Sequence, residues 1–233
     1  MEPTFLSKYL NVRFTGEIAE PDPEHKGMVI TISRDTGCNG MPIVKEVIKV
    51  LNANLKGINK KHPWKYVSKE IFEKSAKKLN VNPDIFDKLE NSRDKSFVEE
   101  ILRSFSTERY PSEFKIKKTF KEVIRSVEKG GGVVILGRAG IAIVKHNRRN
   151  LHVKLSAPIE WRVNKVAREY KISETRAHKH VIESDQKRNN FKRYYMRRKV
   201  AYTDYDLVLN VSTLTKKEIC SAIVSMIKEK SNL

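Results

Sequence analysis

The chain has 233 residues, which is enough for one α/β domain with an insertion and too few for two ordinary domains. Its 47 lysines and arginines outnumber 28 acids, and the net charge of +19 favours an anionic partner, although a solvated lysine-rich surface would explain much of the excess. Two cysteines, Cys38 and Cys220, exclude a disulfide framework or a cysteine zinc cluster. With no long apolar run and no signal-like N-terminus, the sequence predicts a soluble, cytoplasmic protein.

The most informative stretch follows residues 1–26, which match neither a long helix nor paired strands and are expected to form an N-terminal extension. A β-branched run over 29–32 predicts a buried strand, Gly37 and Gly40 open a loop, and apolar residues at helical spacing predict a helix over 44–55. Such a loop brings unpaired N–H groups and a helix dipole to one point, where an anion is stabilised. We therefore predict a phosphate-binding loop here.

This loop departs from the P-loop pattern G-x-x-x-x-G-K-[ST] at the two positions that carry chemistry. Met41 stands where the lysine belongs, and Pro42 replaces the hydroxyl residue that binds magnesium. Arg34 beside the loop and Lys45 in the helix are the candidate replacements for the missing cation. The pattern therefore predicts the fold of a phosphate-binding protein with impaired phosphoryl-transfer chemistry.

Helices and strands alternate in the rest of the chain, which predicts a parallel sheet. The stretch GINKKHPWKY is expected to be a polar connection, and short helices are expected between 68 and 105. The later predicted elements are a helix over 114–129, strands over 133–137, 151–157 and 206–212, a helix that contains Arg162, a helix capped by Ser173, and a final helix that starts at Thr215.

Two basic features lie where parallel sheets bind ligands. Arg138 follows the strand over 133–137, so it lies at the carboxyl edge of the sheet. There an arginine can make a bidentate hydrogen bond to a phosphate. The helix after Ser173 carries a run of lysines and arginines over 176–199, in which Arg188 lies one turn after Asp185. Most of this run is expected to be a solvated face. Its aromatic residues either stack on nucleic-acid bases or pack against the core: Phe191, Tyr194 and Tyr195.

Five segments, in this order, resemble the cytidylate-kinase-like family of P-loop nucleoside monophosphate kinases: TISRDTGCNGMPIVKEV, VVILGRAG, VKLSAPIEWRVNKV, ESDQKRNNF and YDLVLNVSTLT. The resemblance implies a three-layer α/β P-loop NTPase fold, with a parallel sheet flanked by helices. It places the kinase-like domain at 27–233, a helical monophosphate-binding insertion at 57–112 and a basic lid at 160–200. Closure of such a lid excludes water and aligns the phosphates.

The resemblance also implies roles for single residues. Arg138 matches the arginine that contacts the acceptor monophosphate. Arg162 and Arg188 match lid arginines that neutralise the transferring group, and Asp185 matches the acid before the second of them. ATP is the implied cofactor, Mg²⁺ is weakly supported because Pro42 has no hydroxyl, and no residue is assigned as a metal ligand. The resemblance assigns four residues to the ATP phosphates through their backbone: Gly37, Cys38, Asn39 and Gly40. Thr36 at the start of the loop and Arg34 beside it complete the predicted ATP phosphate-binding set.

Three functions compete on this sequence. The leading hypothesis is ATP-dependent phosphorylation of a nucleoside monophosphate such as CMP or dCMP, which the arginine set favours. The second is a pseudokinase that binds a nucleotide or another phosphorylated ligand without turnover, which the altered loop favours. The third is a nucleic-acid-binding protein that uses the basic run over 176–199.

Overall fold

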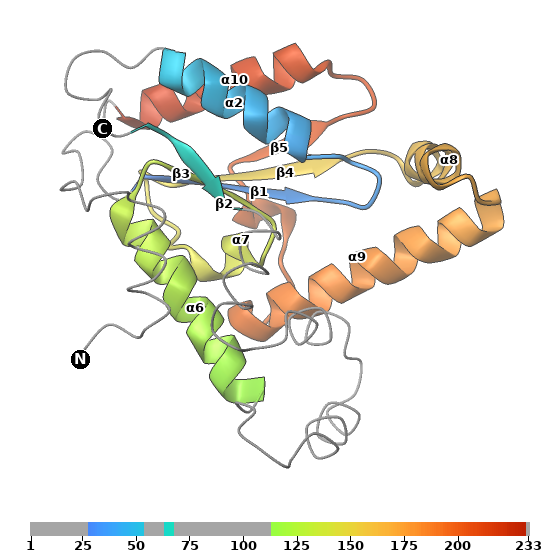
Figure 1. The fold of residues 1–233 in the computed structure, drawn as a ribbon, viewed down its shortest axis with the longest axis horizontal. Coiled ribbons are helices and arrows are strands. Elements are labelled where there is room, and N and C mark those ends of the chain that lie inside the picture. The colour runs from blue at the N-terminus through green and yellow to red at the C-terminus, as the bar shows by residue number, and fades with distance from the viewer. Residues whose placement is uncertain (1–27, 54–62, 68–112, 232–233) are drawn as a thin grey trace.

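The computed structural model describes residues 28–53, 63–67 and 113–231. These residues form a five-stranded sheet in the order β2-β3-β1-β4-β5, in which every pairing is parallel (Figure 1). The strands are β1 (Val29–Arg34), β2 (Lys65–Val67), β3 (Val133–Leu136), β4 (Leu151–Ser156) and β5 (Leu207–Asn210). The helices are α2 (Met41–Ala53), α6 (Glu113–Gly130), α7 (Gly140–Ile143), α8 (Ile159–Tyr170), α9 (Glu174–Met196) and α10 (Lys216–Ser231), with a 3₁₀ turn at Tyr202–Asp204.

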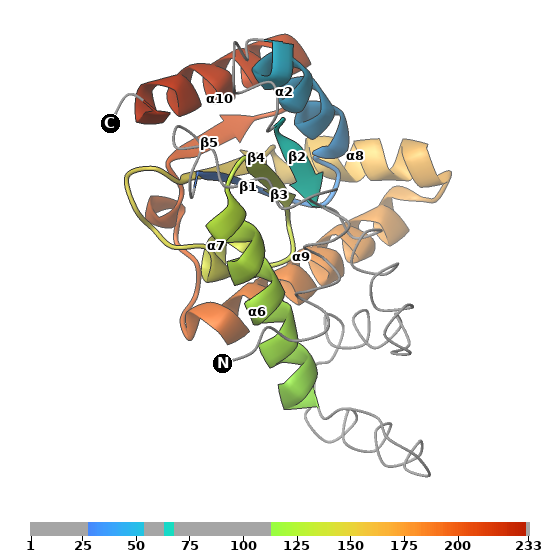
Figure 2. The ribbon, with the colours of Figure 1, turned by 60° about the vertical axis from the view of Figure 1, so that its left-hand side comes forward.

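Helices cover both faces of the sheet. Ile30 and Ile32 of β1 belong to a core shared with α2 and α10, whereas Val29 belongs to a second core shared with α6, α7 and α9. Figures 1 and 2 show α2 and α10 on one side of the strands and α6, α7 and α9 on the other. This arrangement confirms the predicted α/β class, a parallel sheet flanked by helices. No helix in the described ranges is both long and apolar enough to cross a bilayer.

The alternation of β4 places polar side chains next to the loop that follows β1. Leu151, Val153 and Leu155 lie in the core shared with α2 and α10. Because successive strand residues point to opposite faces, Lys154 and Ser156 point toward the α9 side, where both contact Asp35. The strand pattern that builds the core therefore also builds one wall of the candidate site.

Residues 65–67 correct the sequence prediction. The sequence predicts a polar connection and a helical insertion at 57–112 there, but residues 65–67 form β2, which pairs with β3 at the edge of the sheet. Asn52 of α2 fixes the preceding residue, because its amide accepts the N–H of Trp64 at 2.7 Å and donates to the Trp64 carbonyl at 3.1 Å. The rest of that insertion and the extension at 1–26 lie outside the described residues.

Helix α9 begins as predicted, since Ser173 Oγ accepts the N–H of Arg176 at 3.4 Å. Near its other end, Phe191 and Tyr195 pack against Phe120 of α6, with ring centroids 5.6 and 6.2 Å apart. The core alternative is therefore confirmed for these two rings. They are not available to stack on nucleic-acid bases, which weakens the nucleic-acid hypothesis.

Candidate phosphate-binding site

The loop between β1 and α2 has two N–H groups engaged by protein oxygens. The N–H of Thr36 donates to Asp185 Oδ1 at 2.8 Å, and the N–H of Cys38 donates to the Asp35 carbonyl at 3.0 Å. In this conformation both N–H groups are bonded within the protein, and the assignment of the Cys38 N–H to ATP stays a prediction. Burial, reinforced by the charge of Asp35, raises the pKa of the Cys38 thiol to about 11, so the thiol is neutral and is not a nucleophile.

Three other N–H groups of the loop remain open. Among residues 28–53, 63–67 and 113–231, no protein atom accepts from the N–H groups of Gly37, Asn39 and Gly40. They directly precede α2, so they share its positive dipole end. The side chain of Asn39 accepts the Met41 N–H at 3.3 Å and so caps the first turn of the helix. The loop therefore retains three of its five predicted phosphate donors.

Gly37 is required where α8 meets the loop. Its φ is +91°, and a Cβ there would lie 3.1 Å from the carbonyl oxygen and 3.2 Å from the Cβ of Arg162. Arg162 stands in the first turn of α8, just after Pro158. Loop and helix therefore pack backbone to backbone, and this contact directs the Arg162 side chain along the loop.

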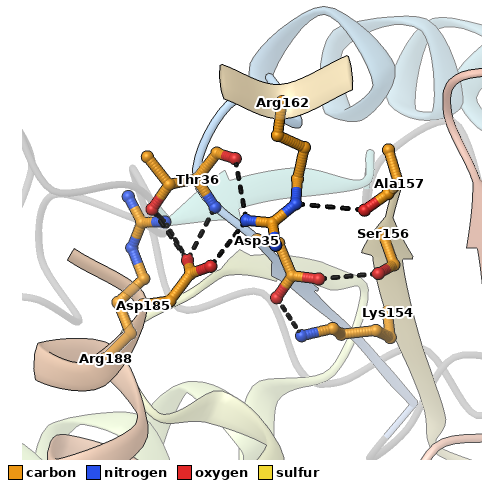
Figure 3. Close-up of polar contacts among 8 residues, drawn as sticks. All are labelled: Asp35, Thr36, Lys154, Ser156, Ala157, Arg162, Asp185 and Arg188. Atoms are coloured by element: carbon orange, nitrogen blue, oxygen red, sulfur yellow. Dashed lines mark hydrogen bonds and ion pairs between the residues drawn. The ribbon is translucent and has the colours of Figure 1, made fainter. Parts of the chain in front are cut away.

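Asp185 of α9 connects the loop to two arginines (Figure 3). Its Oδ1 accepts from the N–H and the hydroxyl of Thr36, and its Oδ2 accepts from Arg162 Nη1 at 2.6 Å. Arg162 also donates to the carbonyls of Thr36 and Ala157, at 3.3 and 3.0 Å. Arg188 Nη1 donates to the Thr36 hydroxyl at 2.8 Å. Four residues predicted for the site thus form one network: Thr36, Arg162, Asp185 and Arg188.

A second ion pair, which the sequence analysis did not predict, lies beside this network. The carboxylate of Asp35 accepts from Lys154 Nζ and from Ser156 Oγ (Figure 3). Burial alone would raise the pKa of Asp35, but the charge of Lys154 and the two hydrogen bonds outweigh burial and hold the pKa below its ordinary value. A signal for it was present in the sequence, because Lys154 is the one lysine or arginine in the predicted strand LHVKLSA.

Two cavities open beside these ion pairs. The smaller, about 30 Å³, is lined by Arg34, Arg138, Arg188 and Lys192 together with Gly137. Arg138 and Arg188 therefore line one cavity although they lie far apart in the chain. The larger cavity, about 440 Å³, lies among β4, α8, α9 and the segment before β5, and its lining residues include Asp35, Lys154, Arg162, Asp185 and Lys192.

Arg34 extends from the end of β1 to Gly137, whose φ is +72°. A Cβ at Gly137 would lie 2.1 Å from Arg34 Nη1, so glycine makes room for the guanidinium. Lys45, the other candidate replacement for the loop lysine, is exposed and lines neither cavity. Arg34 is therefore the cation of the loop that faces the candidate site.

The substitution Gly137→Ala is expected to lower the free energy of unfolding by about 1 kcal/mol, because a side chain at positive φ is strained and displaces Arg34. Urea denaturation measures this loss. Gly130→Ala is the matched control, since Gly130 ends α6 and a Cβ there meets nothing within 4 Å. Equal stability of the two variants would contradict the packing described for Arg34.

The donor set beside the loop does not fit a protein-held magnesium ion. Asp35 and Asp185 are each paired with a cation, and the Thr36 hydroxyl is hydrogen-bonded to Asp185 and Arg188. In the part of the chain that the structure describes, no group of three or more acidic, histidine or cysteine side chains could hold a metal ion. The described side chains beside the loop therefore offer paired acids and an excess of arginine and lysine, a set of groups that does not suit a protein-held magnesium ion.

The order of the sheet strands, the loop before α2 and the arginines that face it define the class: an α/β protein with the fold of the P-loop kinases. The model of the cytidylate kinase-like family matches residues 29–213, and the chain belongs to this family. A cytidylate kinase of Sulfolobus acidocaldarius is 30% identical over 116 residues, which cover 49% of this chain. The alignment spans 63% of that relative, less than two thirds of its length.

One solved structure shows the same architecture, and a second resembles the chain more distantly. An uncharacterized protein from Eubacterium ventriosum superposes with a TM-score of 0.58 at 16% identity, over 88% of this chain and 99% of that protein. The shikimate kinase of Bacteroides thetaiotaomicron gives a TM-score of 0.46 at 13% identity, over 88% and 99% of the two chains. At such low identity, the first of these likenesses establishes the architecture only.

Proposed function

We propose that this protein transfers the γ-phosphoryl group of ATP to a nucleoside monophosphate, with CMP or dCMP as the preferred acceptor. The observation that carries the proposal is the convergence of Arg138 and Arg188 on one cavity beside a loop with open N–H groups. Membership of the cytidylate kinase-like family and the relative named cytidylate kinase support a phosphate acceptor of this kind. A cytoplasmic location for this activity stays a prediction.

In the proposed reaction, an oxygen of the acceptor phosphate attacks the γ-phosphorus of ATP. The bond from that phosphorus to the β,γ-bridging oxygen breaks, and ADP leaves with the electron pair. The open N–H groups of Gly37, Asn39 and Gly40 hold the β-phosphate of ATP, and Arg138 holds the acceptor. Arg188 neutralises the equatorial oxygens of the group in transfer, where a positioned cation stabilises the transition state more than the ground state.

Asp185 is assigned a positioning role. It holds Arg162 at 2.6 Å and lies 3.6 Å from Arg188, so both guanidinium groups stand at the loop before any ligand arrives. Because Asp185 also accepts from the Thr36 N–H, it ties the position of α9 to the conformation of the loop. Arg162 has a nearly buried side chain, 10% exposed, so it contributes its charge with little screening by water.

The second candidate is a pseudokinase that binds a phosphorylated ligand without turnover. Two observations favour it: Met41 and Pro42 provide neither a cation nor a hydroxyl, and the loop N–H groups of Thr36 and Cys38 are already occupied. The intact arginine set makes this the second choice, because Arg138, Arg162 and Arg188 match the arginines that hold the acceptor and neutralise the group in transfer.

The deciding experiment measures ADP formation from ATP with CMP, dCMP, UMP or AMP as acceptor. We expect product with the cytidine monophosphates at a turnover below the roughly 1 to 100 per second of ordinary kinases. Arg188→Ala should remove this activity, while Arg176→Ala, an exposed arginine on the same helix, should leave it unchanged. ATP binding without product from any acceptor would establish the pseudokinase instead.

A further inference from the structure

Lys192 of α9 lies in the wall between the two cavities and lines both of them. It follows Arg188 by four residues and Asp185 by seven, so all three lie on one face of the helix. The side chain of Lys192 is half-buried, and it makes no hydrogen bond or ion pair with any part of the chain that the structure describes. A half-buried ammonium group that lines a cavity without a partner has three N–H donors to offer to an anion bound there.

The nearby acids are not available to pair with Lys192. Asp35 is held by Lys154 and Ser156, and Asp185 by Arg162 and Thr36. The other titratable side chains that line the two cavities are five cations and two tyrosines: Arg34, Arg138, Arg188, Arg193, Lys199, Tyr202 and Tyr205. The cavities thus carry an excess of positive charge around Lys192, which a bound anion would neutralise.

We propose that Lys192 is a further phosphate-binding residue, which supplies from α9 the ammonium group that position 41 of the loop lacks. The inference rests on the proposed function in one respect only, namely that the phosphate belongs to a nucleotide. The charge near the phosphates determines the electrostatic stabilisation, so the cation can come from α9 as well as from the loop. Phosphate binding then requires α9 to be in place.

This placement makes phosphate binding depend on pH. Burial, reinforced by the charge of Lys154, lowers the pKa of Lys192 to about 8, while Asp35 and Asp185 act in the opposite direction. A bound phosphate dianion favours the charged ammonium and so raises the pKa of Lys192. By the same linkage, phosphate binds more weakly at a pH at which the ammonium of the unliganded protein has lost its proton. Phosphomonoesters keep their charge from pH 7 to 9, because their second pKa lies near 6. Affinity should therefore fall about tenfold between pH 7 and 9.

The test is calorimetric titration with CMP at pH 7, 8 and 9. The wild-type affinity should fall about tenfold over this range. Lys192→Arg should bind equally well at pH 7 and 9, because arginine keeps its charge. Lys192→Met should bind about tenfold more weakly than the wild type at pH 7 and show no pH dependence. Lys179→Met removes an exposed lysine from the same helix and should behave as the wild type.

A second measurement separates this inference from the proposed function. In ¹³C NMR of labelled lysines, the signal that Lys192→Arg removes should titrate near pH 8. Saturating inorganic phosphate should move that titration above pH 9, whether or not the protein phosphorylates CMP. A titration that phosphate leaves unchanged, or a Lys192→Met variant with wild-type CMP affinity at pH 7, would overturn the role of Lys192 even in an active kinase.

Discussion

Replacement of Asp185 by alanine is expected to lower the free energy of unfolding by about 3 kcal/mol and to abolish phosphoryl transfer. The substitution leaves the nearly buried guanidinium of Arg162 without its carboxylate and removes the acceptor for both donors of Thr36. A buried charge that loses its partner cannot recover its hydration, which is why the cost exceeds that of an exposed ion pair. Urea denaturation at pH 7 and the ADP assay measure the two effects.

Glu183→Ala is the matched control for this prediction. It removes the same charge from the same helix, and no hydrogen bond or ion pair is found for Glu183 among the described residues. Asp185→Asn keeps one acceptor oxygen without the charge, so its stability should lie between the alanine variant and the wild type. If Asp185→Ala were no less stable than Glu183→Ala, the network in Figure 3 would not hold the loop to α9.

The double substitution Met41→Lys, Pro42→Ser is expected to raise turnover about tenfold or more, because it restores the lysine and the hydroxyl of the P-loop pattern. Met41 is the first residue of α2 and only partly buried, so a lysine stem can occupy its place. Pro42 is exposed in the first turn, where the helix needs no N–H donor, so serine costs little stability.

Met41→Leu, Pro42→Ala is the control, since it changes the same positions without adding a charge or a hydroxyl and should give the wild-type rate. The ADP assay with CMP compares the three proteins at saturating substrate. A wild-type turnover already within the roughly 1 to 100 per second of ordinary kinases would show that Arg34 or Lys192 fully replaces the loop lysine. In that case the added lysine would bring no gain, and the description of the loop as impaired would be wrong.

The elements with strong local patterns could be predicted from the sequence. The apolar runs of β1 and β3 and the Ser173 cap of α9 each fix an element through neighbouring residues. The strand β2 could not be predicted in this way. It has three residues, and its pairing with β3 depends on the clamp between Asn52 and Trp64.

The candidate site could be predicted only in part from the sequence, because its contacts join segments that lie far apart in the chain. Asp185 could be placed next to Arg188 from helix spacing, but its shorter contacts are with Arg162 on α8 and Thr36 in the loop. Such contacts between distant segments depend on the packing of three elements at the edge of the sheet. The ion pair between Asp35 and Lys154 depends in the same way on the pairing of β1 with β4.

The most direct test of the central claim uses a bisubstrate compound in which five phosphates join adenosine to cytidine. If the loop and the arginines of the smaller cavity form one transfer site, this compound occupies both at once and should bind at least about tenfold more tightly than ATP alone. Arg138→Ala and Arg188→Ala should each weaken its binding about tenfold or more, because each removes a charge-assisted contact to phosphate. An affinity no higher than that of ATP, unchanged in both variants, would contradict a single phosphoryl-transfer site between the loop and α9.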